Sequence, residues 1–131
     1  MKIQAAARLK ASNLLEAAPV NRKYFKGIST LLKSPIVTGG GGLYEDFIHI
    51  PKASLTKTVG KLEGAGWKEI APPANWHLPA GSKCFQRDPE GMRFAIQPIQ
   101  PRDESLYSDL DNPPAVGDYR ITAPLTSKQV K

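Results

Sequence analysis

The most regular hydrophobic pattern in the chain is the alternation of residues 92–97, in which Met92, Phe94 and Ile96 occupy every second position. A period of two predicts a half-buried strand. The preceding sequence, Asp-Pro-Glu-Gly at residues 88–91, is typical of a turn, because proline presets the second position and glycine permits a positive φ. Residues 83–87 form another strand-like run before this turn, so the two segments predict an antiparallel hairpin.

The residues before this hairpin predict two strands with a helix between them. The short runs Phe-Ile-His-Ile at residues 47–50 and Trp-Lys-Glu-Ile at residues 67–70 predict the strands. Residues 54–66 predict the helix, with a serine as its N-cap and a Gly-Ala-Gly sequence at its end. The apolar positions of this helix recur at intervals of four and three residues: Leu55, Val59 and Leu62.

Two further helices are predicted near the N-terminus. Residues 4–17 are rich in alanine and leucine and precede Pro19, which ends the first helix. Residues 22–33 have apolar side chains at intervals of three and four residues, and Pro35 ends the second helix. A run of four glycines at residues 39–42 then predicts a flexible hinge.

The chain changes character after Pro98. Five prolines between residues 98 and 124 disfavour long helices and central strands. Scattered apolar residues between them are expected to anchor the segment on a partner; these are Tyr107, Leu110, Val116, Tyr119, Ile121 and Leu125. The pattern therefore predicts an extended arm.

Taken together, these patterns predict an α+β fold with a small βαββ(β) core, an antiparallel or mixed sheet and packed helices. The core spans residues 43–98. A basic helical arm with the glycine hinge precedes it over residues 1–42, and a proline-rich extended arm follows over residues 99–131. A core of this size gives marginal burial, which favours support from the arms or from an assembly.

Positive charge is concentrated at the N-terminal end of the chain, whose formal net charge is +6. Residues 1–42 contain seven Lys or Arg residues and a single acidic residue, Glu16. Such a segment fits contact with nucleic acid or an acidic protein surface, or simply a solvated helix face. The candidate partner-binding residues are five of these cations, one aromatic residue in a loop and four of the C-terminal anchors. They are Arg8, Lys10, Arg22, Lys23 and Lys26, then Trp76, and then Tyr107, Leu110, Tyr119 and Ile121.

The sequence contains little that indicates catalysis. Cys84 is the single cysteine, so no intrachain disulfide is possible and a cytosolic location or assembly site is expected. His49 and His77 have no short ligand spacing with each other or with Cys84. The N-terminus lacks the apolar run of a secretory leader, and no stretch is long enough to span a membrane. We therefore assign no catalytic, cofactor-binding or metal-binding residues.

Residues 47–98 resemble one βαβββ module of the vicinal-oxygen-chelate superfamily, which includes glyoxalases and bleomycin-resistance proteins. The resemblance rests on the helix end at residues 61–67, the strand at residues 84–87 and the Asp-Pro-Glu-Gly turn with the strand after it. It implies a cupped sheet formed by two modules, which a homodimer would supply. Ala95 stands where that superfamily has a metal-binding glutamate, so the resemblance does not extend to its metal chemistry.

The sequence favours a non-enzymatic structural or interaction protein that docks through its arms. Its N-terminal Ala-Ala-Ala-Arg-Leu-Lys-Ala sequence is faintly similar to leaders of tailed-bacteriophage proteins. A small virion component assembled in the cytoplasm, such as a capsid cement or connector protein, is the first hypothesis. A dimeric vicinal-oxygen-chelate-like binder or enzyme is the second. Nucleic-acid binding by residues 1–33 is the third.

Overall fold

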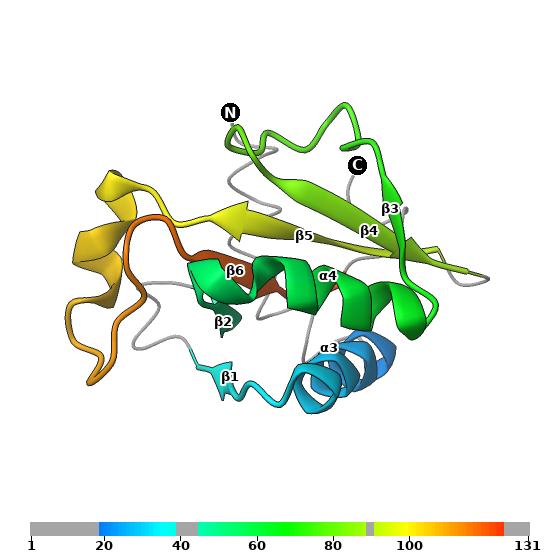
Figure 1. The fold of residues 1–131 in the computed structure, drawn as a ribbon, viewed down its shortest axis with the longest axis horizontal. Helices are drawn as coiled ribbons and strands as arrows, with labels where there is room; N and C mark the ends of the chain where they lie inside the picture. The colour runs from blue at the N-terminus through cyan, green and yellow to red at the C-terminus, as the bar shows by residue number, and fades with distance from the viewer. Residues whose placement is uncertain (1–18, 39–44, 89–90, 125–131) are drawn as a thin grey trace.

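The computed structural model describes residues 19–38, 45–88 and 91–124, and Figure 1 shows their arrangement. The predicted helix over residues 4–17 and the glycine run at residues 39–42 lie outside the described residues. The described part has an α+β fold, as the sequence predicts. Its elements, in chain order, are α3 (Pro19–Leu32), β1 (Ile36–Val37), β2 (Phe47–Ile50), η1 (Lys52–Ser54), α4 (Leu55–Gly64), β3 (Lys68–Ile70), β4 (Lys83–Arg87), β5 (Met92–Pro98), η2 (Pro101–Tyr107) and β6 (Tyr119–Thr122).

The strands form one six-stranded sheet in the order β1-β2-β6-β5-β4-β3, with every neighbouring pair antiparallel. Helices α3 and α4 lie side by side on one face of the sheet (Figure 1). Apolar side chains of both helices join the main core. The predicted hairpin is present as β4 and β5, where Arg87 pairs with Met92 and Gly91 has a φ of 69°.

The central position of β6 is the main difference from the sequence-based expectation. The sequence predicts an extended arm over residues 99–131 that docks on a partner, yet within it β6 pairs with β2 on one side and with β5 on the other. Proline does not prevent this, because Pro113 and Pro114 precede the strand and Pro124 follows it. No proline lies among the four residues of β6, so none of their own N–H groups is lost, and Pro98 of the neighbouring β5 stands at the end of its strand, opposite Tyr119.

The main core lies between the sheet and the two helices. Its centre is a row of three isoleucines from adjacent strands, because Ile121 of β6 is paired with Ile48 of β2 and Ile96 of β5. All three side chains are fully buried. Trp67 and Phe94 extend this core toward β4 with a ring-centroid distance of 4.8 Å in an edge-to-face arrangement, a favourable geometry for aromatic pairs.

A smaller core lies where η2 meets the sheet. Phe47, Ile99 and Tyr107 are buried together, with Leu106 and Leu110 partly buried against them. The rings of Phe47 and Tyr107 are 4.9 Å apart between centroids. This second cluster attaches the segment after β5 to the beginning of β2, and it contains two of the residues that the sequence suggested as docking anchors.

The described α-helices, α3 and α4, end in the same hydrogen-bonding motif with different residues at the left-handed position. In α4, Gly66 has a φ of 96°, its N–H bonds to the carbonyl of Glu63, and the N–H of Trp67 bonds to the carbonyl of Leu62. This is the Schellman pattern that the Gly-Ala-Gly sequence predicts. In α3, Lys33 occupies the equivalent position with a φ of 55°. A side chain with a Cβ is strained in this conformation.

The two helix ends predict opposite effects of a reciprocal substitution. Lys33→Gly should stabilise the protein by about 0.5–1 kcal/mol, because relief of the left-handed strain exceeds the added freedom of the unfolded chain. Gly66→Lys should destabilise it by about 1–2 kcal/mol, since the new Cβ meets only ordinary contacts and the strain dominates. Urea denaturation measures both changes, and the same sign for both would contradict this account.

The position of β6 predicts a large effect at a residue that the sequence assigned to an arm. Ile121→Ala should lower the free energy of unfolding by about 2–5 kcal/mol, because it leaves a cavity at a fully buried site. Val116→Ala is the matched control, since Val116 is exposed and the expected change is within about 0.5 kcal/mol. Equal effects of the two substitutions in urea denaturation would show that β6 does not belong to the core.

Candidate functional site

The structure separates the predicted partner-binding residues into exposed and buried groups. Arg22, Lys23 and Lys26 are exposed on α3. Arg8 and Lys10 lie outside the described residues. Trp76 is half-buried in the loop between β3 and β4. Among the predicted residues that the structure describes, the cations on α3 are therefore the ones that are fully exposed to a partner.

The C-terminal anchors lie within the chain's own core, which corrects the expectation for these side chains. Tyr107 is 1% exposed and Ile121 is fully buried. Leu110 and Tyr119 are partly buried against the smaller and the main core, respectively. Their apolar character is explained by packing within one chain, because β6 and η2 bring them onto the sheet. In this fold, Tyr107 and Ile121 cannot contact a partner.

Arg22, Lys23 and Lys26 together form a surface that we call the basic face of α3. They lie within about 100° of the helix circumference, because Lys26 is four positions from Arg22 and three from Lys23, and residues at these spacings are neighbours on a helix surface. The sequence places them there because Phe25, Ile28 and Leu32 take the opposite, buried side. Helix α3 has no acidic residue, and no ion pair joins these three cations to another described residue.

Neighbouring elements add further positive charge beside α3. The guanidinium of Arg87, at the end of β4, lies 6.0 Å from the ring centroid of Tyr24 on α3. This is within the range of a cation–π contact. Helix α4 packs beside α3 and carries Lys57 and Lys61, with Glu63 as its single acidic residue. The helical layer therefore presents an excess of positive charge.

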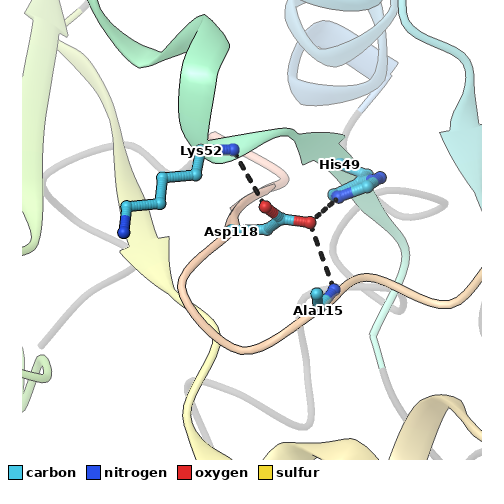
Figure 2. Close-up of polar contacts among 4 residues, drawn as sticks. All are labelled: His49, Lys52, Ala115 and Asp118. Carbon is cyan, nitrogen blue, oxygen red and sulfur yellow. Dashed lines mark hydrogen bonds and ion pairs between the residues drawn. The ribbon is translucent and has the colours of Figure 1, made fainter.

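A polar cluster around Asp118 lies at the beginning of β6 (Figure 2). The carboxylate accepts hydrogen bonds from Nε2 of His49 at 2.8 Å, from the backbone N–H of Lys52 at 2.9 Å and from the backbone N–H of Ala115 at 3.1 Å. The side chains of His49 and Asp118 are 30% and 18% exposed, respectively. The cluster thus joins the turn before β6 to the end of β2 and the start of η1.

These hydrogen bonds determine the protonation of the Asp118 carboxyl group. Burial alone would raise its pKa, but the hydrogen bonds from His49 and from the two backbone N–H groups outweigh burial and hold the pKa below the ordinary value of 3.8. Asp118 is therefore ionised at neutral pH and can only accept hydrogen bonds. It follows that Nε2 of His49 carries a proton and that a neutral His49 ring has its lone pair on Nδ1.

An oriented His–Asp pair can serve as a general base when a nucleophile lies beside it. The one thiol of the chain does not meet this requirement. Cys84 lies on β4, which β5 and β6 separate from the strand of His49. Burial, with a smaller contribution from Glu69, raises the pKa of Cys84 to about 11, so its thiol is protonated at neutral pH. The observed contacts of Asp118 instead describe a structural link.

A second polar cluster is buried beneath η2. Arg120 of β6 donates a hydrogen bond from Nη1 to the hydroxyl oxygen of Tyr107 at 2.5 Å, and the same nitrogen lies 3.8 Å from Oδ2 of Asp103. Asp103 also accepts a hydrogen bond from the backbone N–H of Gln100 in a capping box at the start of η2. Burial raises the pKa of Tyr107 and outweighs the opposing effect of Arg120, so the phenol stays protonated at neutral pH.

Neither polar cluster was found by local sequence patterns. His49 and Asp118 are 69 residues apart, and His49 meets β6 only because it pairs with Arg120 in the sheet. One local signal was present: Tyr119 and Ile121 alternate with Arg120 and Thr122, which is the period of a strand. The surrounding prolines obscured this signal.

Comparisons with protein-family models, with curated proteins and with solved structures found no match. Within residues 19–38, 45–88 and 91–124, no group of three or more His, Cys, Asp or Glu side chains is placed to hold a metal ion. Among the same residues, no helix has the length and apolar character needed to cross a membrane.

The Asp118 cluster predicts a pH-dependent contribution to stability. Asp118→Ala should lower the free energy of unfolding by about 1–3 kcal/mol at pH 7, because it leaves His49 and two N–H groups without their acceptor. Because folding lowers the pKa of Asp118, this contribution to stability is complete above pH 3.8. It is lost as the pH falls through the pKa of Asp118 in the folded state. The difference between wild type and variant should therefore shrink in acid.

Urea denaturation at several pH values measures this difference. Asp111→Ala is the matched control, because Asp111 is an exposed aspartate in the same segment and should change stability by less than about 0.5 kcal/mol. A difference for Asp118→Ala that stays constant from neutral to strongly acidic pH would contradict the role assigned to the carboxylate.

Proposed function

We propose that this protein is a non-enzymatic interaction protein, a component of a larger assembly that binds an acidic protein surface through the basic face of α3. The observation that carries the proposal is the exposure of Arg22, Lys23 and Lys26 on a helix without acidic residues and without ion pairs to other described residues. Exposed cations gathered on one rigid element favour binding of an oppositely charged partner.

The firm attachment of α3 to the sheet supports this proposal. Phe25 and Ile28 of α3 are almost fully buried in the main core, so the helix cannot rotate its cations away without breaking that packing. A surface fixed in this way loses little conformational freedom on binding beyond that of its own long side chains. The polar clusters at Asp118 and Arg120, by contrast, use their hydrogen-bonding groups within the chain.

An acidic protein surface suits this face better than nucleic acid because the molecule also carries an acidic region. Between residues 101 and 118, five acidic residues accompany one basic residue, Arg102. A long polyanion such as duplex DNA that extends beyond α3 along the molecule would meet this region, whereas a folded protein partner contacts only a limited patch. The phage-like N-terminal sequence suggests a virion as the kind of assembly, with this chain as a small accessory, cement or connector component.

Binding to a labelled polyglutamate peptide tests the proposal by fluorescence anisotropy. The α3 variant neutralises the basic face with Arg22→Gln, Lys23→Gln and Lys26→Gln. The matched control variant removes the same net charge from three exposed residues elsewhere: Lys52→Gln, Lys68→Gln and Arg102→Gln. The α3 variant should bind roughly tenfold more weakly than wild type, since three exposed charge contacts are lost. The control should lose less than about threefold, because distant charges are screened.

Equal losses in the two variants would show that net charge, not the basic face of α3, governs binding, and would contradict the proposal. Unlabelled duplex DNA serves as a competitor in the same assay. If duplex DNA displaces the labelled peptide at a lower concentration than unlabelled polyglutamate does, the basic face of α3 binds nucleic acid in preference. That result would also contradict the proposal.

A further inference from the structure

The described part of the chain carries opposite charges on two separate surfaces. The first is the basic face of α3. The second, which we call the acidic segment, consists of the exposed residues Glu104, Asp109 and Asp111 in and after η2. Asp103 does not belong to it, because its side chain is buried beside Arg120. No ion pair joins the three exposed carboxylates to another described residue.

The fold prevents the two surfaces from meeting within one molecule. Figure 1 shows η2 at the left end of the sheet, beyond β5, whereas α3 lies below the right half of the sheet. Both are held in place by core residues: Tyr107 attaches η2 to Phe47, and Phe25 attaches α3 to the main core. Neither element can swing across the sheet without exposing buried aromatic side chains.

We infer that the acidic partner of α3 is a second copy of this chain, whose acidic segment contacts the basic face of α3 in a head-to-tail arrangement. This inference rests on the proposed function, because it names the partner of the same face. The two surfaces are different patches of one molecule, so the contact is heterologous and leaves one free surface of each kind on a dimer. Repetition of such a contact forms a ring or an open chain.

The chemistry of the contact determines how it should respond to salt. All six side chains are solvent-exposed, and exposed ion pairs are individually weak and screened by ions. The Debye length falls from about 10 Å at 0.1 M to about 3 Å at 1 M ionic strength. The association is therefore expected to be weak at the lower ionic strength and to disappear at the higher one.

Sedimentation velocity of the full chain over a range of concentrations tests the inference with two reversed-charge variants. The first carries Arg22→Glu, Lys23→Glu and Lys26→Glu. The second carries Glu104→Lys, Asp109→Lys and Asp111→Lys. Each variant alone should sediment as a monomer, because its two surfaces then have the same sign. An equimolar mixture should associate again, since each surface of one variant now meets an opposite charge on the other.

The control variant with Lys52→Gln, Lys68→Gln and Arg102→Gln should associate at least as well as wild type, because it keeps both surfaces. Circular dichroism melting checks that every variant is folded. A wild-type chain that remains monomeric at about 0.1 M ionic strength overturns the inference. So does a mixture of the two reversed variants that fails to associate. Loss of polyglutamate binding in both neutralised variants alike would instead refute the proposed function, so the two failures are distinguishable.

Discussion

The pairing of β6 with both β2 and β5 is the interaction on which the rest of the structure depends. Without β6, strands β1 and β2 would form one small hairpin and β3 to β5 would form another sheet, each with an unpaired edge. Buried backbone groups at those edges would lose their hydrogen-bond partners. Ile121 would also be missing from the centre of the main core, between Ile48 and Ile96. Strand β6 therefore completes a sheet that the earlier residues begin.

The two polar clusters are consequences of this pairing. Asp118 stands immediately before β6 and binds the end of β2, whereas Arg120 stands within β6 and binds η2. Both clusters hold the chain in place where it enters β6, and their hydrogen-bonding groups are occupied by contacts within the chain. The side chains predicted as C-terminal anchors likewise pack within this chain. Among the described residues that the sequence predicts to bind a partner, the cations of α3 are the ones that stay fully exposed.

Local patterns in the sequence predict most of the elements but not their arrangement. The helix over residues 22–33, the strand at residues 47–50 and the hairpin at residues 83–97 follow from periodicity and turn residues, and the structure confirms them. The position of β6 depends on pairing with β2, some seventy residues away, which no local pattern encodes. The meeting of His49 and Asp118 depends on the same long-range pairing. The exposed cations of α3 were predictable, because a helix with one apolar side must present its other side to solvent.

Native-state hydrogen exchange of the β6 amides tests the central position of this strand most directly. A strand between two partners opens only with much of the sheet, so the hydrogen-bonded amides of residues 119–122 should exchange as slowly as those of β2 and β5. Exchange should also show the same dependence on denaturant for all three strands. Fast exchange in β6 together with protection in β4 and β5 would show that residues 99–124 are a separable arm, and it would contradict a central role for β6.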